Sequence, residues 1–80
     1  MRVWLIEKRK KINKTQKDIA HRAQISKSMY AMIENGERNP SVYVAKKIAL
    51  VLNFEWTVFL MKNVTIRVYE NLEGTENLYD

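Results

Sequence analysis

Two short helices joined by a turn of a few residues are the feature that most limits how this chain can fold. Thr15 can cap the first helix, and Asp18 stands three residues later, as in a capping box. Ser26 can cap the second helix, which is expected to stop at Gly36. So brief a connection forces the two helices to cross at a steep angle. The predicted helices cover residues 16–23 and 27–35.

Helical periodicity predicts one more helix before this pair. It covers residues 2–12, and one stripe along it carries Leu5, Arg9 and Ile12. Asn13 is expected to end it, because asparagine tolerates the left-handed conformation that a helix C-terminus often needs.

Two further helices are expected after Gly36. The first begins after Ser41 and ends at Asn53, with apolar residues at helical spacing. They are Val42, Ala45, Ile48, Ala49 and Leu52. The second lies around residues 56–61, and its apolar side chains are expected to cover the core. They are Trp56, Phe59 and Leu60. The predicted fold class is therefore all-α, with five helices.

The chain changes character after residue 62. Residues 64–69 alternate with period two and include several β-branched side chains, so this segment is a candidate β-strand. Residues 70–80 are polar and acidic, and we expect them to be loose. The sequence is therefore divided into a domain at residues 1–62 and a C-terminal extension at residues 63–80.

Charge is distributed unevenly along the chain. Residues 1–61 hold 12 Lys/Arg against 5 Asp/Glu, a balance of +7, whereas residues 62–80 hold 2 against 4, a balance of −2. A basic surface of this kind fits an ordinary solvated face and a nucleic-acid face about equally well. No segment approaches the ~18 apolar residues of a membrane span, and the apolar patch at 3–6 runs into charged residues, the reverse of a signal peptide. We therefore expect a cytoplasmic protein without membrane contact.

Five groups of residues follow one another in a distinctive order between Thr15 and Ser41. They are Thr15-Gln16, Ile19-Ala20, Ser26, Ile33-Glu34-Asn35-Gly36 and Asn39-Pro40-Ser41. This order resembles the Cro/phage-repressor (XRE-like) helix-turn-helix family. The resemblance covers roughly residues 5–60. It implies a lambda-repressor-like DNA-binding domain whose second motif helix, the recognition helix, enters a major groove. Gln24 departs from the family because it stands where glycine is usual, so it has to adopt a left-handed conformation or the turn differs.

Helix geometry divides the recognition helix into two faces. Tyr30 and Ile33 share an inner face, because residues three apart lie on the same side of a helix. On the outer face, the resemblance implies that three residues read DNA base edges. They are Lys27, Ser28 and Met32. Lysine can donate to guanine, serine can pair with several base edges, and methionine can contact a thymine methyl. The alternative is an ordinary exposed helix face.

The resemblance also implies residues that contact the DNA backbone. They are Gln16, Asn35 and Arg38. Gln16 lies in the first turn of a helix, where free backbone N–H groups attract a phosphate, although it could serve only as a polar helix-start residue. Asn35 fits a purely local role at a helix end equally well. Arg9 and Glu34 match a family pair in which an arginine on the first helix bridges the end of the recognition helix.

The resemblance implies a sequence-specific DNA-binding transcriptional regulator. We expect it to be a repressor that binds a pseudo-palindromic operator of double-stranded DNA. We expect a homodimer, because one recognition helix covers few base pairs. Trp56, Val58 and Phe59 offer apolar surface for the two-fold contact, and the segment at 64–69 could add a strand pair across it.

The alternative hypothesis is an antitoxin-type interaction module that autoregulates its operon. In that case the acidic residues 70–80 bind a partner protein. No enzymatic activity and no cofactor are expected, because no catalytic triad, carboxylate pair or glycine-rich phosphate loop is present. No metal site is expected either, since His21 is the only histidine and the chain has no cysteine.

Overall fold

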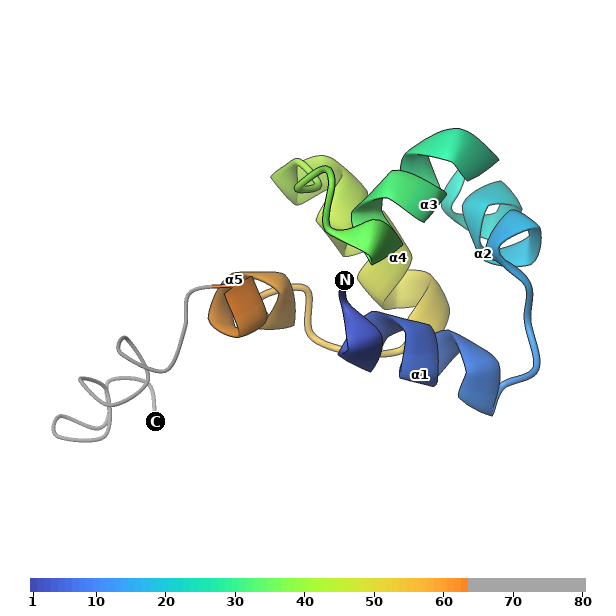
Figure 1. Cartoon of the computed structure of the whole chain (residues 1–80), viewed down its shortest axis with the longest axis horizontal. Helices are drawn as coiled ribbons and strands as arrows, with labels where there is room; N and C mark the ends of the chain where they lie inside the picture. The colour runs from blue at the N-terminus through green and yellow to red at the C-terminus, as the bar shows by residue number, and fades with distance from the viewer. Residues whose placement is uncertain (64–80) are drawn as a thin grey trace, which may run out of the picture.

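The computed structural model describes residues 1–63, and every regular element in this part of the chain is an α-helix (Figure 1). The elements are α1 (Val3–Lys11), α2 (Gln16–Ala23), α3 (Lys27–Asn35), α4 (Val42–Leu52) and α5 (Val58–Asn63). The predicted all-α fold with five helices is therefore confirmed for the described residues. No helix among them is long and apolar enough to cross a membrane. The candidate strand at 64–69 and the acidic segment at 70–80 lie outside the described residues.

The predicted N-terminal caps are formed. Thr15 Oγ1 accepts a hydrogen bond from the Asp18 N–H at 3.1 Å, and Asp18 Oδ2 accepts one from the Thr15 N–H at 2.9 Å, which completes a capping box. Ser26 and Ser41 each accept a hydrogen bond from the backbone N–H three residues later, at 3.0 and 3.1 Å. These contacts satisfy N–H groups that a helix start leaves without a partner, so α2, α3 and α4 begin where the sequence predicts.

Four residues with positive φ lie at the ends of helices. They are Asn13 (57°), Gln24 (61°), Gly36 (83°) and Asn53 (60°). Gln24 therefore adopts the left-handed conformation in the turn between α2 and α3, at a steric cost that glycine would not have. Lys47 Nζ donates a hydrogen bond to Gln24 Oε1 at 2.9 Å, so α4 holds the side chain of this turn residue.

The core is formed by all five helices. Its buried apolar residues are Leu5, Ile19, Ala20, Ala23, Tyr30, Ile33, Ala45, Ile48, Ala49 and Phe59. Phe59 attaches α5, which lies at the opposite side of the molecule from α2 (Figure 1). The Trp4 ring meets Phe59 and Phe54 in edge-on arrangements, with centroid distances of 5.1 and 5.4 Å. This aromatic cluster links α5 to α1.

Three apolar positions differ from the sequence prediction. Ile12 and Val42 continue the predicted stripes of their helices, and Leu60 was expected to cover the core, but the exposed fractions of the three are 45%, 52% and 54%. Ile12 follows the last residue of α1 and Val42 is the first residue of α4, so both lie at helix ends that reach past the core. The last helix begins at Val58, two residues later than predicted, and Phe59 occupies the buried position while Leu60 points outward.

Candidate nucleic-acid interface

The outer face of α3 is open to solvent. Tyr30 and Ile33 are fully buried, as predicted for the inner face of this helix. Lys27 and Ser28 are exposed, whereas Met32 is half-buried. The face therefore presents two polar side chains without obstruction, and Met32 offers only part of its surface.

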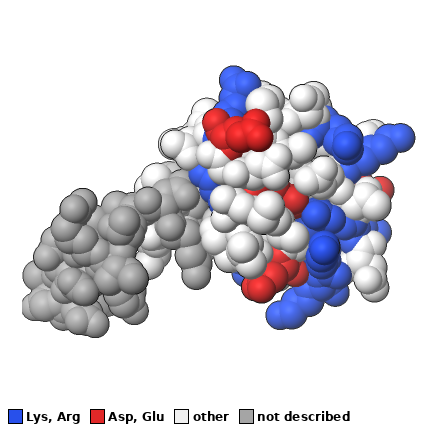
Figure 2. Space-filling model, viewed as in Figure 1, with Lys and Arg blue, Asp and Glu red and all other residues white. Residues whose placement is uncertain are grey.

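An open hollow of about 540 Å³ lies beside the N-termini of α2 and α3; we name it the basic hollow. It brings Gln16 and Lys27 together, two residues that the sequence assigned to different kinds of DNA contact. Its lining residues are Arg9, Lys10, Asn13, Lys14, Thr15, Gln16, Lys17 and Lys27. Five of these eight are basic and none is acidic, and Figure 2 shows Lys and Arg side chains gathered along the edge that α1 and α2 form. Positive side chains next to a helix N-terminus favour binding of an anion such as phosphate.

Arg9, which lines this hollow, forms an ion pair with the buried Glu34. Arg9 Nε donates to Glu34 Oε2 at 2.6 Å, and Arg9 Nη2 donates to Glu34 Oε1 at 3.1 Å, a bidentate geometry. The exposed fractions of the two side chains are 11% and 1%. Arg9 Nη1 also donates to the carbonyl oxygen of Lys14 at 2.8 Å. The pair thus joins α1 to the end of α3 and to the segment that precedes α2.

The carboxylate of Glu34 remains ionised in this buried position. Burial alone would raise its pKa, but hydrogen bonds from Arg9 and Gln16 outweigh burial and hold the pKa below its usual range. The same hydrogen bond from Arg9 to Glu34 raises the pKa of Arg9. Burial, and then the nearby Glu34 carboxylate, raises the pKa of Tyr30. Tyr30 is therefore a neutral part of the core.

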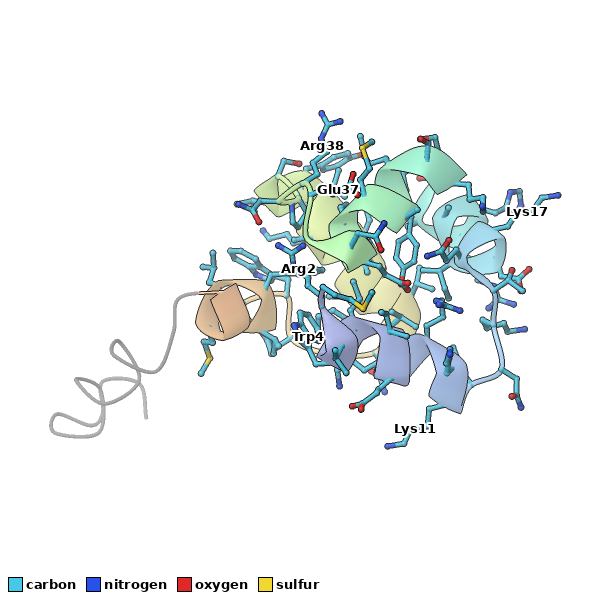
Figure 3. The ribbon with its side chains drawn as sticks, in the orientation of Figure 1. Arg2, Trp4, Lys11, Lys17, Glu37 and Arg38 are labelled. Atoms are coloured by element: carbon cyan, nitrogen blue, oxygen red, sulfur yellow. The ribbon has the colours of Figure 1, made fainter. Side chains whose placement is uncertain are left out.

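Gln16 uses its side chain within the protein. Its Nε2 donates to Glu34 Oε1 at 2.9 Å, so the amide links α2 to the ion pair while the residue also lines the basic hollow. The predicted contact between Gln16 and the DNA backbone stays a prediction. Asn35 and Arg38 are exposed at and after the end of α3. In Figure 3, Lys17 and Arg38 lie at separate points of the surface, with α3 between them.

Arg2 is the residue that the sequence did not reveal. Its side chain is 6% exposed, and its guanidinium donates to the carbonyl oxygens of Ile33 and Arg38 and to Asn39 Oδ1. Burial lowers the pKa of Arg2. No local pattern could have identified it, because its hydrogen-bond acceptors lie 31 to 37 residues along the chain and two of them are main-chain groups.

Comparison with known proteins identifies the family of this chain. Residues 5–59 match the family model described as helix-turn-helix. The chain is 51% identical over 59 residues to the uncharacterized HTH-type transcriptional regulator YqaF of Bacillus subtilis (strain 168), which covers 74% of this chain and 78% of that protein. It is 40% identical over 53 residues to an uncharacterized HTH-type transcriptional regulator of Archaeoglobus fulgidus, which covers 66% of this chain and 75% of that protein. No solved structure gives a significant match. The chain therefore belongs to the Cro/phage-repressor type of the helix-turn-helix family, a family of DNA-binding transcriptional regulators.

Proposed function

We propose that this protein is a sequence-specific transcriptional repressor that places α3 in the major groove of a pseudo-palindromic operator. The observation that carries the proposal is the outer face of α3, where Lys27 and Ser28 are exposed and Lys27 lines the basic hollow. The inner face of the same helix is closed by Tyr30 and Ile33. The helix thus has one face available, and that face adjoins positive charge suited to the DNA backbone.

Each group of residues has a distinct role in this proposal. Lys27, Ser28 and Met32 contact base edges, with most of the discrimination coming from the two exposed polar side chains. Gln16 binds a phosphate from the basic hollow, and Arg38 binds one on the other side of α3, together with Asn35. Backbone contacts on both sides of a helix fix its register in the groove, which base recognition requires.

We further propose that two copies bind the operator together. Two half-sites roughly 34 Å apart match one turn of DNA, and a symmetric dimer can present two recognition helices at that spacing. The prediction that Phe59 takes part in the two-fold contact is wrong, because Phe59 is only 2% exposed within one copy of the domain. Leu60 and Met61 on α5 are 54% and 49% exposed, which supports a two-fold contact through these residues instead.

The test is selection of bound sites from random duplex DNA. We expect an enriched sequence with two related half-sites whose centres lie one helical turn apart. A Lys27→Ala/Ser28→Ala variant should select a different sequence or none. Lys46→Ala is the matched control, because it also removes a positive charge but lies on α4, against the Trp56 ring. The same selected sequence from wild type and the Lys27/Ser28 variant would refute base reading by α3.

A further inference from the structure

The end of α3 is completed by residues from the N-terminus of the chain. The last carbonyl groups of a helix lack partners within the helix and need donors from elsewhere. The N–H groups of Gly36 and Glu37 supply two, to Ile33 and Met32 at 3.2 and 2.9 Å. Arg2 supplies two more: its backbone N–H donates to the Glu34 carbonyl oxygen at 2.7 Å, and its Nη1 donates to the Ile33 carbonyl oxygen.

The same guanidinium group holds the loop that follows α3. Nη1 of Arg2 donates to the Arg38 carbonyl oxygen at 3.2 Å, and Nη2 donates to Asn39 Oδ1 at 2.6 Å. Figure 3 shows Arg2 at the start of α1, on the side that faces this loop. The guanidinium carbon lies 5.7 Å from the centroid of the Phe59 ring, so one side of the group is covered by the aromatic cluster. Arg2 itself is 6% exposed, so the access of water to these part-buried contacts is limited.

Close packing of the first residue supports the same arrangement. Gly36 has a φ of 83°, and a Cβ atom at this position would lie 3.3 Å from the backbone nitrogen of Met1. Both the left-handed conformation and this contact favour glycine. The N-terminus is therefore packed against the turn between α3 and the loop, as well as hydrogen-bonded to it.

We propose that Arg2 is a positioning residue for DNA binding, which sets the backbone of Asn35–Arg38 before DNA arrives. This inference rests on the proposed phosphate contact by Arg38. The Arg38 side chain is exposed while its carbonyl oxygen is held by Arg2, so the side chain extends from a fixed backbone. A contact made from an ordered loop loses less conformational entropy on binding than one made from a loose loop.

A double-mutant cycle on DNA affinity tests this role. The probe is a short fluorescent DNA duplex of mixed sequence, because phosphate contacts act on every sequence. Arg2→Lys keeps the charge but loses the planar fork that reaches three acceptors. We expect Arg38→Ala to weaken DNA binding in the wild-type background. In the Arg2→Lys background, the fold-loss of affinity caused by Arg38→Ala should be at least ~3-fold smaller, because residues that act together do not contribute independently. Lys46→Ala is the control: Arg38→Ala should weaken DNA binding by the same factor with and without Lys46→Ala.

Asn39→Ala keeps the inference testable if Arg2→Lys fails to fold. Asn39 is exposed, so the Asn39→Ala variant should stay folded, and circular dichroism would verify this. The substitution nevertheless removes one hydrogen-bond acceptor of Arg2. Asn39→Ala should therefore show the same coupling to Arg38→Ala. If Arg38→Ala weakens DNA binding by the same factor in the wild-type, Arg2→Lys and Asn39→Ala backgrounds, the positioning role is overturned and the proposed function stands. If Arg38→Ala alone leaves affinity and its salt dependence unchanged, the proposed phosphate contact fails, and this inference fails with it.

Discussion

Removal of Arg9 should expose how strongly this domain depends on one buried ion pair. The Glu34 side chain is 1% exposed in the folded domain, and Arg9→Ala leaves it with Gln16 as its remaining side-chain donor, at 2.9 Å. Breaking a buried pair in this way costs about 3–5 kcal/mol, whereas an exposed pair is worth about 1 kcal/mol or less. The carbonyl oxygen of Lys14 also loses its hydrogen bond from Arg9, so the upper part of that range is expected.

That loss is large beside the total stability of a domain of this size. At roughly 0.05–0.15 kcal/mol per residue, the 80 residues give about 4–12 kcal/mol. Arg9→Ala should therefore lower the free energy of unfolding by about a third or more, and lower the Tm by more than roughly 10 °C. Urea unfolding followed by circular dichroism measures the first quantity, and a thermal melt measures the second.

The double variant isolates the pair itself. Arg9→Ala/Glu34→Ala removes the uncompensated charge. Its loss of unfolding free energy should therefore be smaller than the sum of the losses in the two single variants, by a coupling of about 1–3 kcal/mol. Lys10→Ala removes a neighbouring charge that takes part in no ion pair of the described residues, and it should change stability by less than about 0.5 kcal/mol. Additive losses from Arg9→Ala and Glu34→Ala would refute the reasoning.

Three further outcomes are expected. The pKa of Glu34 is lower in the folded state than the ordinary value of 4.5, so the ionised carboxylate contributes its full stability above that value and loses it as the pH falls through the folded-state pKa. Urea midpoints measured across this pH range should show the loss of stability, and the loss should be smaller in Glu34→Gln. Arg38→Ala should reduce the slope of log affinity against log salt by roughly 0.9 if one phosphate contact is lost, while Asn35→Ala, which removes no charge, should scarcely change it. Gln24→Gly should raise the free energy of unfolding by ~0.5–1 kcal/mol, since it relieves the left-handed strain but loses the hydrogen bond from Lys47; a lower Tm would contradict this.

Local signals predicted the helices because the interactions that define them are local. The caps at Thr15, Ser26 and Ser41 each use an N–H three residues away, so a short stretch of sequence contains both partners. Apolar spacing placed the centres of the helices correctly but failed at Ile12 and Val42. Periodicity describes the face of a helix, and it carries no information on where a helix end passes the edge of the core.

Contacts between distant segments could not be predicted in the same way. The register of α5 depends on Phe59 packing on the Trp4 ring. The sequence of that short segment offered Phe59 and Leu60 alike as residues that cover the core, and did not show which of the two is buried. The pairing of Arg9 with Glu34 was available only through the resemblance to a family. Arg2 matched neither a periodic pattern nor a family motif that the sequence displayed, so only the folded structure revealed its contacts.

Under the proposed function, the two faces of α3 divide its side chains between recognition and folding, with consequences for how such a protein can change its target. Lys27 and Ser28 are exposed, and substitutions at such positions usually change stability by less than about 0.5 kcal/mol. If the two side chains read bases as proposed, new operators can arise by their exchange while Tyr30 and Glu34 preserve the packing and the ion pair. Met32 is different, because it is half-buried as well as near the outer face. With base readout as proposed, a substitution at Met32 would alter recognition and packing at once, so it should be accepted less freely as the protein diverges.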